Sequence, residues 1–267
     1  MKKISSRENP VFKQFRGLLS SARERRKQGL TLLDGAHLLD AFLRAGGVPR
    51  TVVIEEAALE NDEIQCLVGM AKLEPIVLSA AMMREISPVD TPTGVVAAVA
   101  VPEPEPLGEE DWVVLDDVQD AGNVGTILRS AAAAGVRDVL LSQGCAQPWS
   151  PKVLRAGMGA HFSLRIHESM DLPRVLAAYK GQCLATFLGA EVSVYDCDLS
   201  GPVAWLFGSE GAGLRPEVMA CASKMVQIPM AAEVESLNVA SAAAVCLFEQ
   251  VRQRRRCGGG AEITPRQ

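Results

Sequence analysis

Polar side chains that could take part in chemistry lie in three stretches of the sequence, each of which follows a short apolar run. They are Asn123, Arg129, Glu210, Ser236 and Asn238. Amide, carboxylate, hydroxyl and guanidinium groups can hold a polar ligand and stabilise developing charge. Turns that follow parallel strands are the usual binding positions in α/β folds. Taken one by one, these residues could equally be helix caps or solvent-exposed side chains.

A glycine-rich loop is expected at residues 206–214. Gly208, Gly211 and Gly213 would let the backbone adopt positive φ angles and approach a ligand closely. The loop has neither the G-x-G-x-x-G pattern of a dinucleotide site nor the Gly-Lys-Ser/Thr of a P-loop. Ser209 is not framed as the nucleophile of a G-x-S-x-G turn. The loop therefore indicates ligand binding without naming the ligand.

The elements that must position these residues alternate between apolar and helical patterns. Continuous apolar runs predict buried strands over 112–118, 138–142, 183–188, 203–209 and 225–230. Helices are predicted over 123–136, 151–160, 171–179 and 238–256. Apolar strands of this length are typical of a parallel sheet covered on both faces. The second half of the chain is therefore predicted to be an α/β domain.

The first hundred residues show a similar alternation. A basic helical stretch is predicted over about 7–28, with Phe12, Phe15, Leu18 and Leu19 on one face. Apolar runs predict strands over 30–33, 51–55, 75–79 and 94–101, and a further helix is expected over 36–45. This alternation also favours an α/β fold.

The prolines of residues 101–112 alternate with acids, a pattern that supports neither a helix nor a central strand. The sequence thus predicts an N-terminal domain over 1–102, an extended linker over 103–111, a second domain over 112–257 and a flexible tail over 258–267.

Composition excludes several classes of protein. Of the 267 residues, 48% are hydrophobic and 22% are charged, which is ordinary for a globular chain and excludes extensive disorder. No apolar run approaches the ~18–20 residues of a membrane span, and no signal peptide is evident at the N-terminus. The 7 cysteines form no C-x-x-C pair, so no metal site is expected, and reduced thiols in a cytoplasm are the simplest interpretation.

The net charge of −5 conceals an uneven distribution. Lysine and arginine dominate residues 1–29, and further arginines occupy 252–256. Such basic ends could hold a polyanion, or could simply be solvated helix faces. The candidates for contacts with such a polyanion are Arg7, Lys13, Arg16, Lys152 and Arg155.

The order and wording of the motifs carry a resemblance. NVGTILR at 123–129, FGSEGAG at 207–213, and IPM followed by ESLNVASAAA at 228–244 closely resemble the three motifs of the SpoU/TrmH-type RNA 2′-O-ribose methyltransferases of the SPOUT superfamily. SPKVLRAGMGAHF at 150–162 is similar to a further segment of that family. LLDGAHLLDAFL and TPTGVVAAV, in the first hundred residues, resemble elements of its N-terminal substrate-binding domain. The match extends over about residues 5–256.

The resemblance implies a trefoil-knotted α/β methyltransferase domain preceded by a smaller α/β domain related to ribosomal protein L30e. It implies S-adenosyl-L-methionine as cofactor and a homodimer with the active site near the subunit interface. The cofactor residues that carry over are Leu188, Gly189, Gly208, Ser209, Glu210, Gly211, Ile228, Met230, Leu237 and Asn238.

The catalytic residues implied by the resemblance are Arg129, Asn123, Glu210, Ser236 and Asn238, all of which are present. The family's usual proposal makes the motif-one arginine the base, whereas a guanidinium, which stays protonated, could instead clamp a phosphate and stabilise the alkoxide. Two positions depart from the pattern. Ala121 stands where proline is common, and Met158 stands where serine is usual.

The implied activity is methylation of a ribose 2′-oxygen, with ribosomal RNA favoured over transfer RNA because a separate N-terminal domain is more typical of the ribosomal RNA members. DNA lacks the 2′-hydroxyl and is excluded as substrate. A non-catalytic RNA-binding or ribosome-assembly protein on the same fold is the alternative, which the intact motifs disfavour. A nicotinamide-dependent oxidoreductase is disfavoured because no G-x-G-x-x-G turn follows a first strand.

Overall fold

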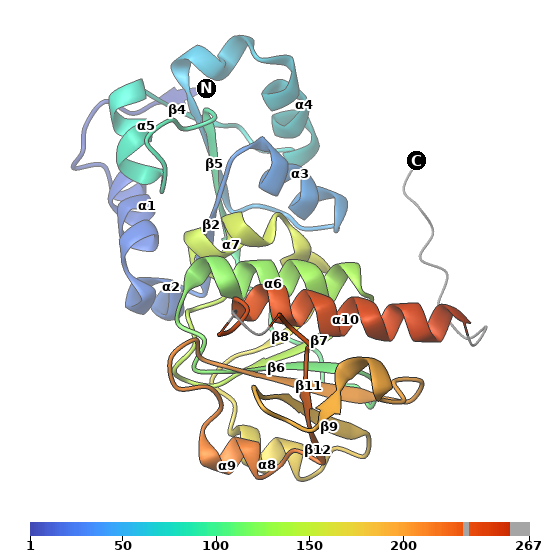
Figure 1. The fold of residues 1–267 in the computed structure, drawn as a ribbon. Coiled ribbons are helices and arrows are strands. Elements are labelled where there is room, and N and C mark those ends of the chain that lie inside the picture. The colour runs from blue at the N-terminus through green and yellow to red at the C-terminus, as the bar shows by residue number, and fades with distance from the viewer. Residues whose placement is uncertain (232–234, 257–267) are drawn as a thin grey trace. The chain divides into compact units, whose positions relative to one another are not determined.

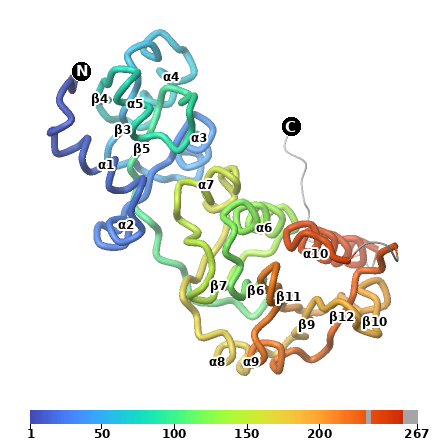
Figure 2. The backbone as a smooth tube through the Cα atoms, turned by 60° about the vertical axis from the view of Figure 1, so that its left-hand side comes forward, coloured from blue at the N-terminus to red at the C-terminus, as the bar shows by residue number. Residues whose placement is uncertain are grey.

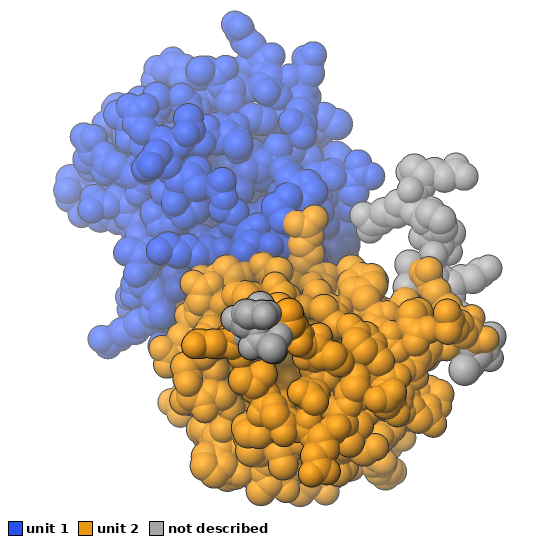
Figure 3. All heavy atoms as spheres, viewed as in Figure 1, with its two compact units in different colours: residues 1–103, 149–162 blue, residues 104–148, 163–267 orange. Residues whose placement is uncertain are grey.

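The computed structural model describes residues 1–231 and 235–256 (Figure 1). The chain forms two compact units, which Figure 3 distinguishes by colour. Unit 1 comprises residues 1–103 and 149–162, and unit 2 comprises residues 104–148 and 163–267. The division after Glu103 falls inside the predicted linker, and residues 149–162 group with unit 1 although they lie between strands of unit 2 in the sequence.

Unit 1 is built on a mixed five-stranded sheet with the order β1-β4-β3-β5-β2. β5 runs antiparallel to β2 and β3, and the remaining pairs are parallel. The strands are β1 (Lys2–Lys3), β2 (Leu30–Asp34), β3 (Thr51–Glu55), β4 (Ile76–Leu78) and β5 (Val95–Ala100). The four apolar runs predicted as strands in this half are thus confirmed.

Six α-helices belong to the described part of unit 1. They are α1 (Pro10–Ser20), α2 (Ala22–Gln28), α3 (Ala36–Arg44), α4 (Asp62–Ala71), α5 (Ala80–Ile86) and α7 (Pro151–Gly157). Phe12, Phe15 and Leu18 of α1 are buried and pack in one cluster with Met83 of α5 and the inner faces of the strands. The predicted apolar face of the N-terminal helical region is therefore confirmed.

The helical stretch predicted over about 7–28 consists of two helices, because the helical backbone is interrupted at Ser21. Ser21 has an extended backbone, and its hydroxyl accepts a hydrogen bond from Glu24 N at 3.2 Å. A serine followed three residues later by a glutamate is a helix-start signal. This cap begins α2 in a new direction, and Gly29, with a φ of 60°, ends it.

Unit 2 contains a seven-stranded sheet with the order β10-β12-β9-β11-β6-β7-β8, in which every pair is parallel. The strands are β6 (Trp112–Asp116), β7 (Asp138–Leu141), β8 (Arg165–His167), β9 (Gln182–Thr186), β10 (Val192–Ser193), β11 (Val203–Gly208) and β12 (Lys224–Gln227). The five predicted strands of this half are confirmed, and β8 and β10 were too short to be predicted.

Helices cover both faces of this sheet, as Figures 1 and 2 show. One layer contains α6 (Ala121–Ala133) and α10 (Val239–Arg256), which pack against each other. The other contains α8 (Leu172–Leu176) and α9 (Pro216–Met219), whose apolar side chains join those of the strands in one cluster. The predicted parallel α/β architecture is therefore confirmed for unit 2.

The strand order of unit 2 reverses at β6. The chain continues from β6 to β7 and β8 on one side, whereas β11, β9, β12 and β10 lie on the other. The carboxyl ends of strands at such a switch point are the usual ligand-binding position in open α/β sheets. All three predicted functional stretches begin at or near the carboxyl ends of β6, β11 and β12.

The predicted linker forms neither helix nor strand, but it is anchored to unit 2. Gly108 N donates to Asp138 Oδ2 at 3.3 Å, and Gly108 O accepts from Trp112 Nε1 at 2.9 Å. Tyr179 Oη donates to Glu110 O at 2.8 Å. In the described ranges, no helix is long and apolar enough to cross a membrane.

Candidate active site

The site begins with a buried carboxylate at the end of a central strand. Asp116 is the last residue of β6 and is fully buried. Its register partner on the neighbouring strand is Gly208, the last residue of β11. The glycine-rich loop therefore starts directly beside Asp116.

Only glycine fits at position 208. A Cβ atom there would lie 2.1 Å from Gly213 C and 2.2 Å from Leu214 N. The loop turns back so sharply that Ser209 and Gly213 exchange two backbone hydrogen bonds of 3.0 Å. Gly213 has a φ of 71°, in the left-handed region that glycine tolerates.

Arg215 closes the loop on the same carboxylate. Its backbone N donates to Asp116 Oδ2 at 2.8 Å, and its Nε donates to Asp116 Oδ1 at 2.8 Å. Hydrogen bonding to Asp116 raises the pKa of the Arg215 guanidinium. Sequence reasoning did not identify this pair, because the two residues are far apart in the chain. The one signal in the sequence was that the otherwise apolar strand β6 ends in an acidic residue, Asp116.

Asn123, Glu210 and Asn238 form a hydrogen-bonded group that we call the polar triad. Asn123 Nδ2 donates to Glu210 Oε1, and Asn238 Nδ2 donates to Asn123 Oδ1 at 2.9 Å. Asp120 caps α6 by accepting from Asn123 N at 2.8 Å. One residue from each predicted functional stretch thus meets the others at this point.

Asn238 has two roles at once. Its Oδ1 accepts from Ala240 N at 2.9 Å and from Ser241 N at 3.3 Å, so it caps the start of α10. Its Nδ2 meanwhile donates to Asn123. The interpretation of Asn238 as a helix cap is therefore confirmed, and the same side chain also joins the polar triad.

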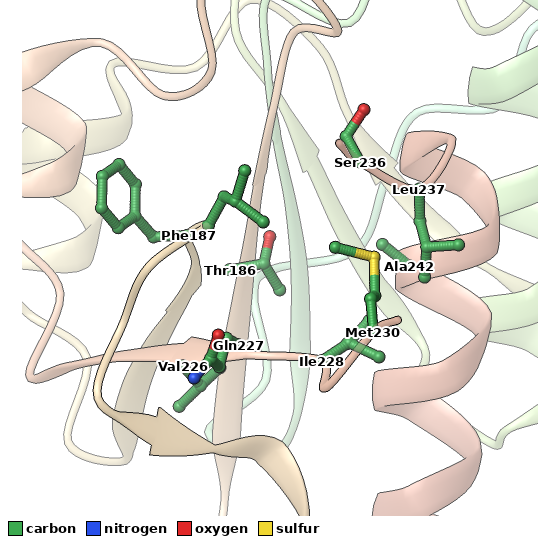
Figure 4. Close-up of a pocket in the computed structure, with 10 residues that line it drawn as sticks. Thr186, Phe187, Val226, Gln227, Ile228, Met230, Ser236, Leu237 and Ala242 are labelled. Atoms are coloured by element: carbon green, nitrogen blue, oxygen red, sulfur yellow. The ribbon is translucent and has the colours of Figure 1, made fainter. Parts of the chain in front are cut away.

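A pocket lies among the carboxyl ends of β9 and β12 and the start of α10 (Figure 4). Its lining residues are Thr186, Phe187, Leu188, Val226, Gln227, Ile228, Met230, Ser236, Leu237 and Ala242. Met230 lies beside Leu237 and Ala242 in Figure 4. The apolar walls and nearby strand ends suit a ligand that combines an aromatic ring with polar groups.

The predicted cofactor residues divide into two groups. Leu188, Ile228, Met230 and Leu237 line the pocket, together with Ser236 from the predicted catalytic set. The other predicted cofactor residues lie outside this lining. They are Gly189, Gly208, Ser209, Glu210, Gly211 and Asn238. Thr186 and Phe187 were not predicted, although they directly precede Leu188 at the end of a strand.

Arg129 lies on α6 and is not hydrogen-bonded to the polar triad. It is exposed and forms no hydrogen bond or ion pair with any residue of the described ranges. Six residues after Asn123, it projects from the helix ~240° further round the axis. The Arg129 side chain is therefore free to bind a ligand without breaking a hydrogen bond or ion pair to the described residues.

Most of the predicted phosphate contacts are already paired. Arg7 lies 2.6 Å from Glu85, Arg16 lies 3.9 Å from Glu85, and Arg155 lies 3.8 Å from Asp34. Lys13 pairs with Glu8, and exposed Lys152 pairs with no acid of the described ranges. Within those ranges, no group of three or more His, Cys, Asp or Glu side chains could hold a metal ion.

Comparisons with known proteins identify the family of this chain. Residues 112–248 match the model of the SpoU rRNA Methylase family, and residues 9–97 match the MRM3-like substrate binding domain. An uncharacterized tRNA/rRNA methyltransferase of Synechocystis is 35% identical over 258 residues, which cover 94% of each chain. The 23S rRNA (guanosine(2553)-2′-O)-methyltransferase of Bacillus subtilis is 29% identical, with 93% of this chain and 98% of the relative covered.

A solved structure extends the likeness to three dimensions. The AdoMet-bound rRNA methyltransferase of Sinorhizobium meliloti superposes with a TM-score of 0.81 at 30% identity, covering 94% of this chain and 97% of the other. The resemblance inferred from the three motifs is thus confirmed. This chain belongs to the SpoU rRNA methylase family.

Proposed function

We propose that the protein transfers a methyl group from S-adenosyl-L-methionine to a ribose 2′-oxygen of ribosomal RNA. The observation that carries the proposal is the polar triad. It joins the three motifs beside an apolar pocket at the carboxyl edge of the sheet. The AdoMet and rRNA named for relatives of nearly equal length support the cofactor and the substrate class.

The pocket fits the cofactor. Leu188, Ile228 and Leu237 offer apolar surface to an adenine ring, and the strand ends offer backbone groups to its polar edge. When bound, S-adenosylmethionine supplies a sulfonium methyl group to the ribose 2′-oxygen, so that a C–O bond forms, the S–C bond breaks and the hydroxyl proton is released.

The residues of this chain would position the reactants. The glycine loop, held by Arg215 on Asp116, fixes Glu210, which in turn orients Asn123. Arg129 would clamp a phosphate next to the target ribose and stabilise the developing alkoxide. The family's alternative makes Arg129 the base that accepts the hydroxyl proton, and the two roles can be separated by substitution.

Several finer features belong to the same proposal. The predicted domain over 112–257, most of which belongs to unit 2, would be the knotted methyltransferase domain, and the region 1–102 would be an L30e-like domain that binds substrate. The enzyme would act as a homodimer in the cytoplasm, with Glu210 near Arg129 of the partner subunit. Transfer RNA is the alternative substrate to ribosomal RNA, and DNA would not be a substrate because it has no 2′-hydroxyl.

The test is transfer of tritiated methyl from S-adenosylmethionine to separate ribosomal and transfer RNA pools from a strain that lacks the protein. We expect label in ribosomal RNA, and its loss with Arg129→Ala. The matched control is Arg137→Ala, which changes another exposed arginine in unit 2. Arg129→Lys keeps the charge but loses the bidentate fork, so near-full activity would contradict the clamp.

Label in transfer RNA alone would move the substrate to the second choice. Cofactor binding without label in either pool, or in precursor ribosomal particles, would instead favour the non-catalytic RNA-binding protein.

A further inference from the structure

The N-terminal hairpin of helices in unit 1 contains an open groove that the motifs do not explain. We call it the α1–α2 groove. Pro10, Val11, Lys13, Gln14 and Gly17 line it from α1, and Glu24 and Gln28 line it from α2. It belongs wholly to unit 1 and is separate from the pocket of unit 2.

Three polar side chains cross the groove as a ladder. Gln14 Nε2 donates to Gln28 Oε1 at 2.7 Å, and Gln28 Nε2 donates to Glu24 Oε2 at 3.1 Å. Each amide nitrogen has a second hydrogen, and the Gln14 oxygen and one Glu24 oxygen make no bond to the described residues. The ladder can therefore both donate to and accept from a ligand.

Gly17 keeps the groove open. Its nearest neighbours are side-chain atoms of Glu24, and a Cβ atom there would lie 3.7 Å from Glu24 Cγ. That separation is an ordinary van der Waals contact, so a methyl group would fit there, and the absence of a side chain at Gly17 widens the groove on this side.

The basic side chains of α1 and α2 differ in whether they pair with acidic side chains. On α1, Lys13 and Arg16 lie within ion-pair distance of acids of unit 1. On α2, Arg23, Arg26 and Lys27 are exposed and pair with no acid of the described ranges. The free positive charge of this region therefore lies on α2.

A buried arginine fixes the orientation of α2. Arg25 is 6% exposed, and its Nη1 donates to Leu18 O at 2.7 Å and to Leu19 O at 3.2 Å. These bonds tie α2 to the carboxyl end of α1. Glu24 and Gln28 then share the groove face, while Arg23 and Lys27 form the adjacent row one position earlier in the helix.

We propose that the α1–α2 groove binds a single-stranded segment of the substrate RNA. Arg23 and Lys27 would contact phosphates, and the ladder of Gln14, Gln28 and Glu24 would contact an unstacked base edge or a ribose hydroxyl. Single strands expose these edges, whereas an A-form duplex hides most of them in its deep major groove. The choice of RNA as ligand rests on the proposed function, and the exposed cations in the row beside the groove favour a polyanion over an uncharged partner.

Fluorescence anisotropy of the full chain tests the groove without cofactor. The probe is a labelled single-stranded RNA of about 12 nucleotides, within the span of known single-strand sites. The charge variant is Arg23→Gln with Lys27→Gln. The matched control is Arg50→Gln with Lys72→Gln, which removes two exposed cations elsewhere in unit 1. Figure 1 shows α4, which ends beside Lys72, at the opposite side of unit 1 from α2.

The charge variant is expected to bind about tenfold more weakly at 0.1 M salt, with a salt slope shallower by about 1.4 for two lost contacts. The control should bind like the wild type. Gln14→Ala with Gln28→Ala should weaken binding without changing the salt slope, because it removes no charge. A charge variant that binds like the control would overturn the proposal, as would competition by polyglutamate equal to that by unlabelled RNA.

The outcome is distinguishable from failure of the proposed function. Affinity for S-adenosylmethionine, measured by calorimetry, should be unchanged in the charge variant because the cofactor pocket belongs to unit 2. In methyl transfer, the KM for RNA should rise about tenfold while kcat is retained. A normal KM with weakened oligonucleotide binding would show that the groove does not hold the substrate.

Discussion

Asn238 is the residue whose two hydrogen-bonding roles can be separated by substitution. Its oxygen caps α10, and its nitrogen donates to Asn123. Aspartate is an equally good cap but has no amide hydrogen, whereas alanine can do neither. We therefore expect Asn238→Ala to lower stability by about 1 kcal/mol and Asn238→Asp to leave it unchanged.

Both substitutions should reduce methyl transfer about tenfold, the loss expected for one hydrogen bond that orients the site. Thermal denaturation and steady-state kinetics of the two variants give the answer. Full activity in Asn238→Asp would mean that the triad contact contributes nothing to catalysis.

Asp34 gives a pH dependence at the residue scale. Its side chain is 4% exposed, and burial raises its pKa even though Ser87 and Arg155 act in the opposite direction. The folded state therefore holds this proton more tightly than the unfolded chain, whose aspartates titrate near 3.8. This stabilisation is complete below that pH and is lost as the pH rises through the folded-state pKa.

Asp34→Asn removes the charge that is costly to bury, so its thermal midpoint should exceed that of the wild type near pH 7. The difference should shrink as the pH is lowered toward about 4. Asp90→Asn, which changes an exposed aspartate of unit 1, is the control and should show no such trend. A constant difference across the pH range would contradict the buried-charge explanation.

At the element scale, the glycine loop after β11 depends on one close approach of its backbone. Gly208→Ala would place a methyl group against Gly213 and Leu214, and we expect a loss of about 1–3 kcal/mol in stability. Displacement of Glu210 should also lower activity. Gly211→Ala is the control, because a Cβ atom at that position would have no neighbouring atom within 4 Å. Equal effects of the two substitutions would exclude the steric explanation.

The elements themselves were largely predictable from the sequence. Apolar runs such as 203–209 identified the buried strands, because a parallel sheet covered on both faces has no polar side to interrupt them. The break at Ser21 was missed because the apolar period of α1 overshadowed a cap signal that the sequence does contain. β10, at two residues, is too short for any periodicity.

The site was predictable only in part, for a different reason. The motifs identified Asn123, Glu210 and Asn238, and the structure brings their side chains together. The bond between Asp116 and Arg215 joins residues distant in sequence, and no local pattern records such a pair. Burial of Asp34 is likewise a property of the folded unit, since its strand alone does not reveal what covers it.

At the scale of the whole molecule, residues 149–162 fold as part of unit 1. Thr31 Oγ1 donates to Trp149 O at 2.6 Å, and Trp149, Val153 and Leu154 are buried. A fragment of residues 104–267 lacks the strand against which α7 packs. Its α7 should therefore lose protection from hydrogen exchange, while β6 and β11 remain protected.

Mass spectrometry of the fragment and the full chain measures this directly. The α6 helix, which packs on α10 within unit 2, serves as the internal control. Equal protection of α7 in both proteins would mean that unit 2 alone stabilises this helix.

The grouping of residues 149–162 with unit 1 also constrains how this architecture can evolve. The chain passes between the units after residues 103, 148 and 162, so unit 1 cannot be gained or lost as one cassette at a terminus. A lineage that discards the first hundred residues leaves Trp149, Val153 and Leu154 uncovered. Proteins that descend from such a deletion must have polar side chains at these positions or a new surface that covers them. The residue types at these positions would therefore show that the deletion had occurred.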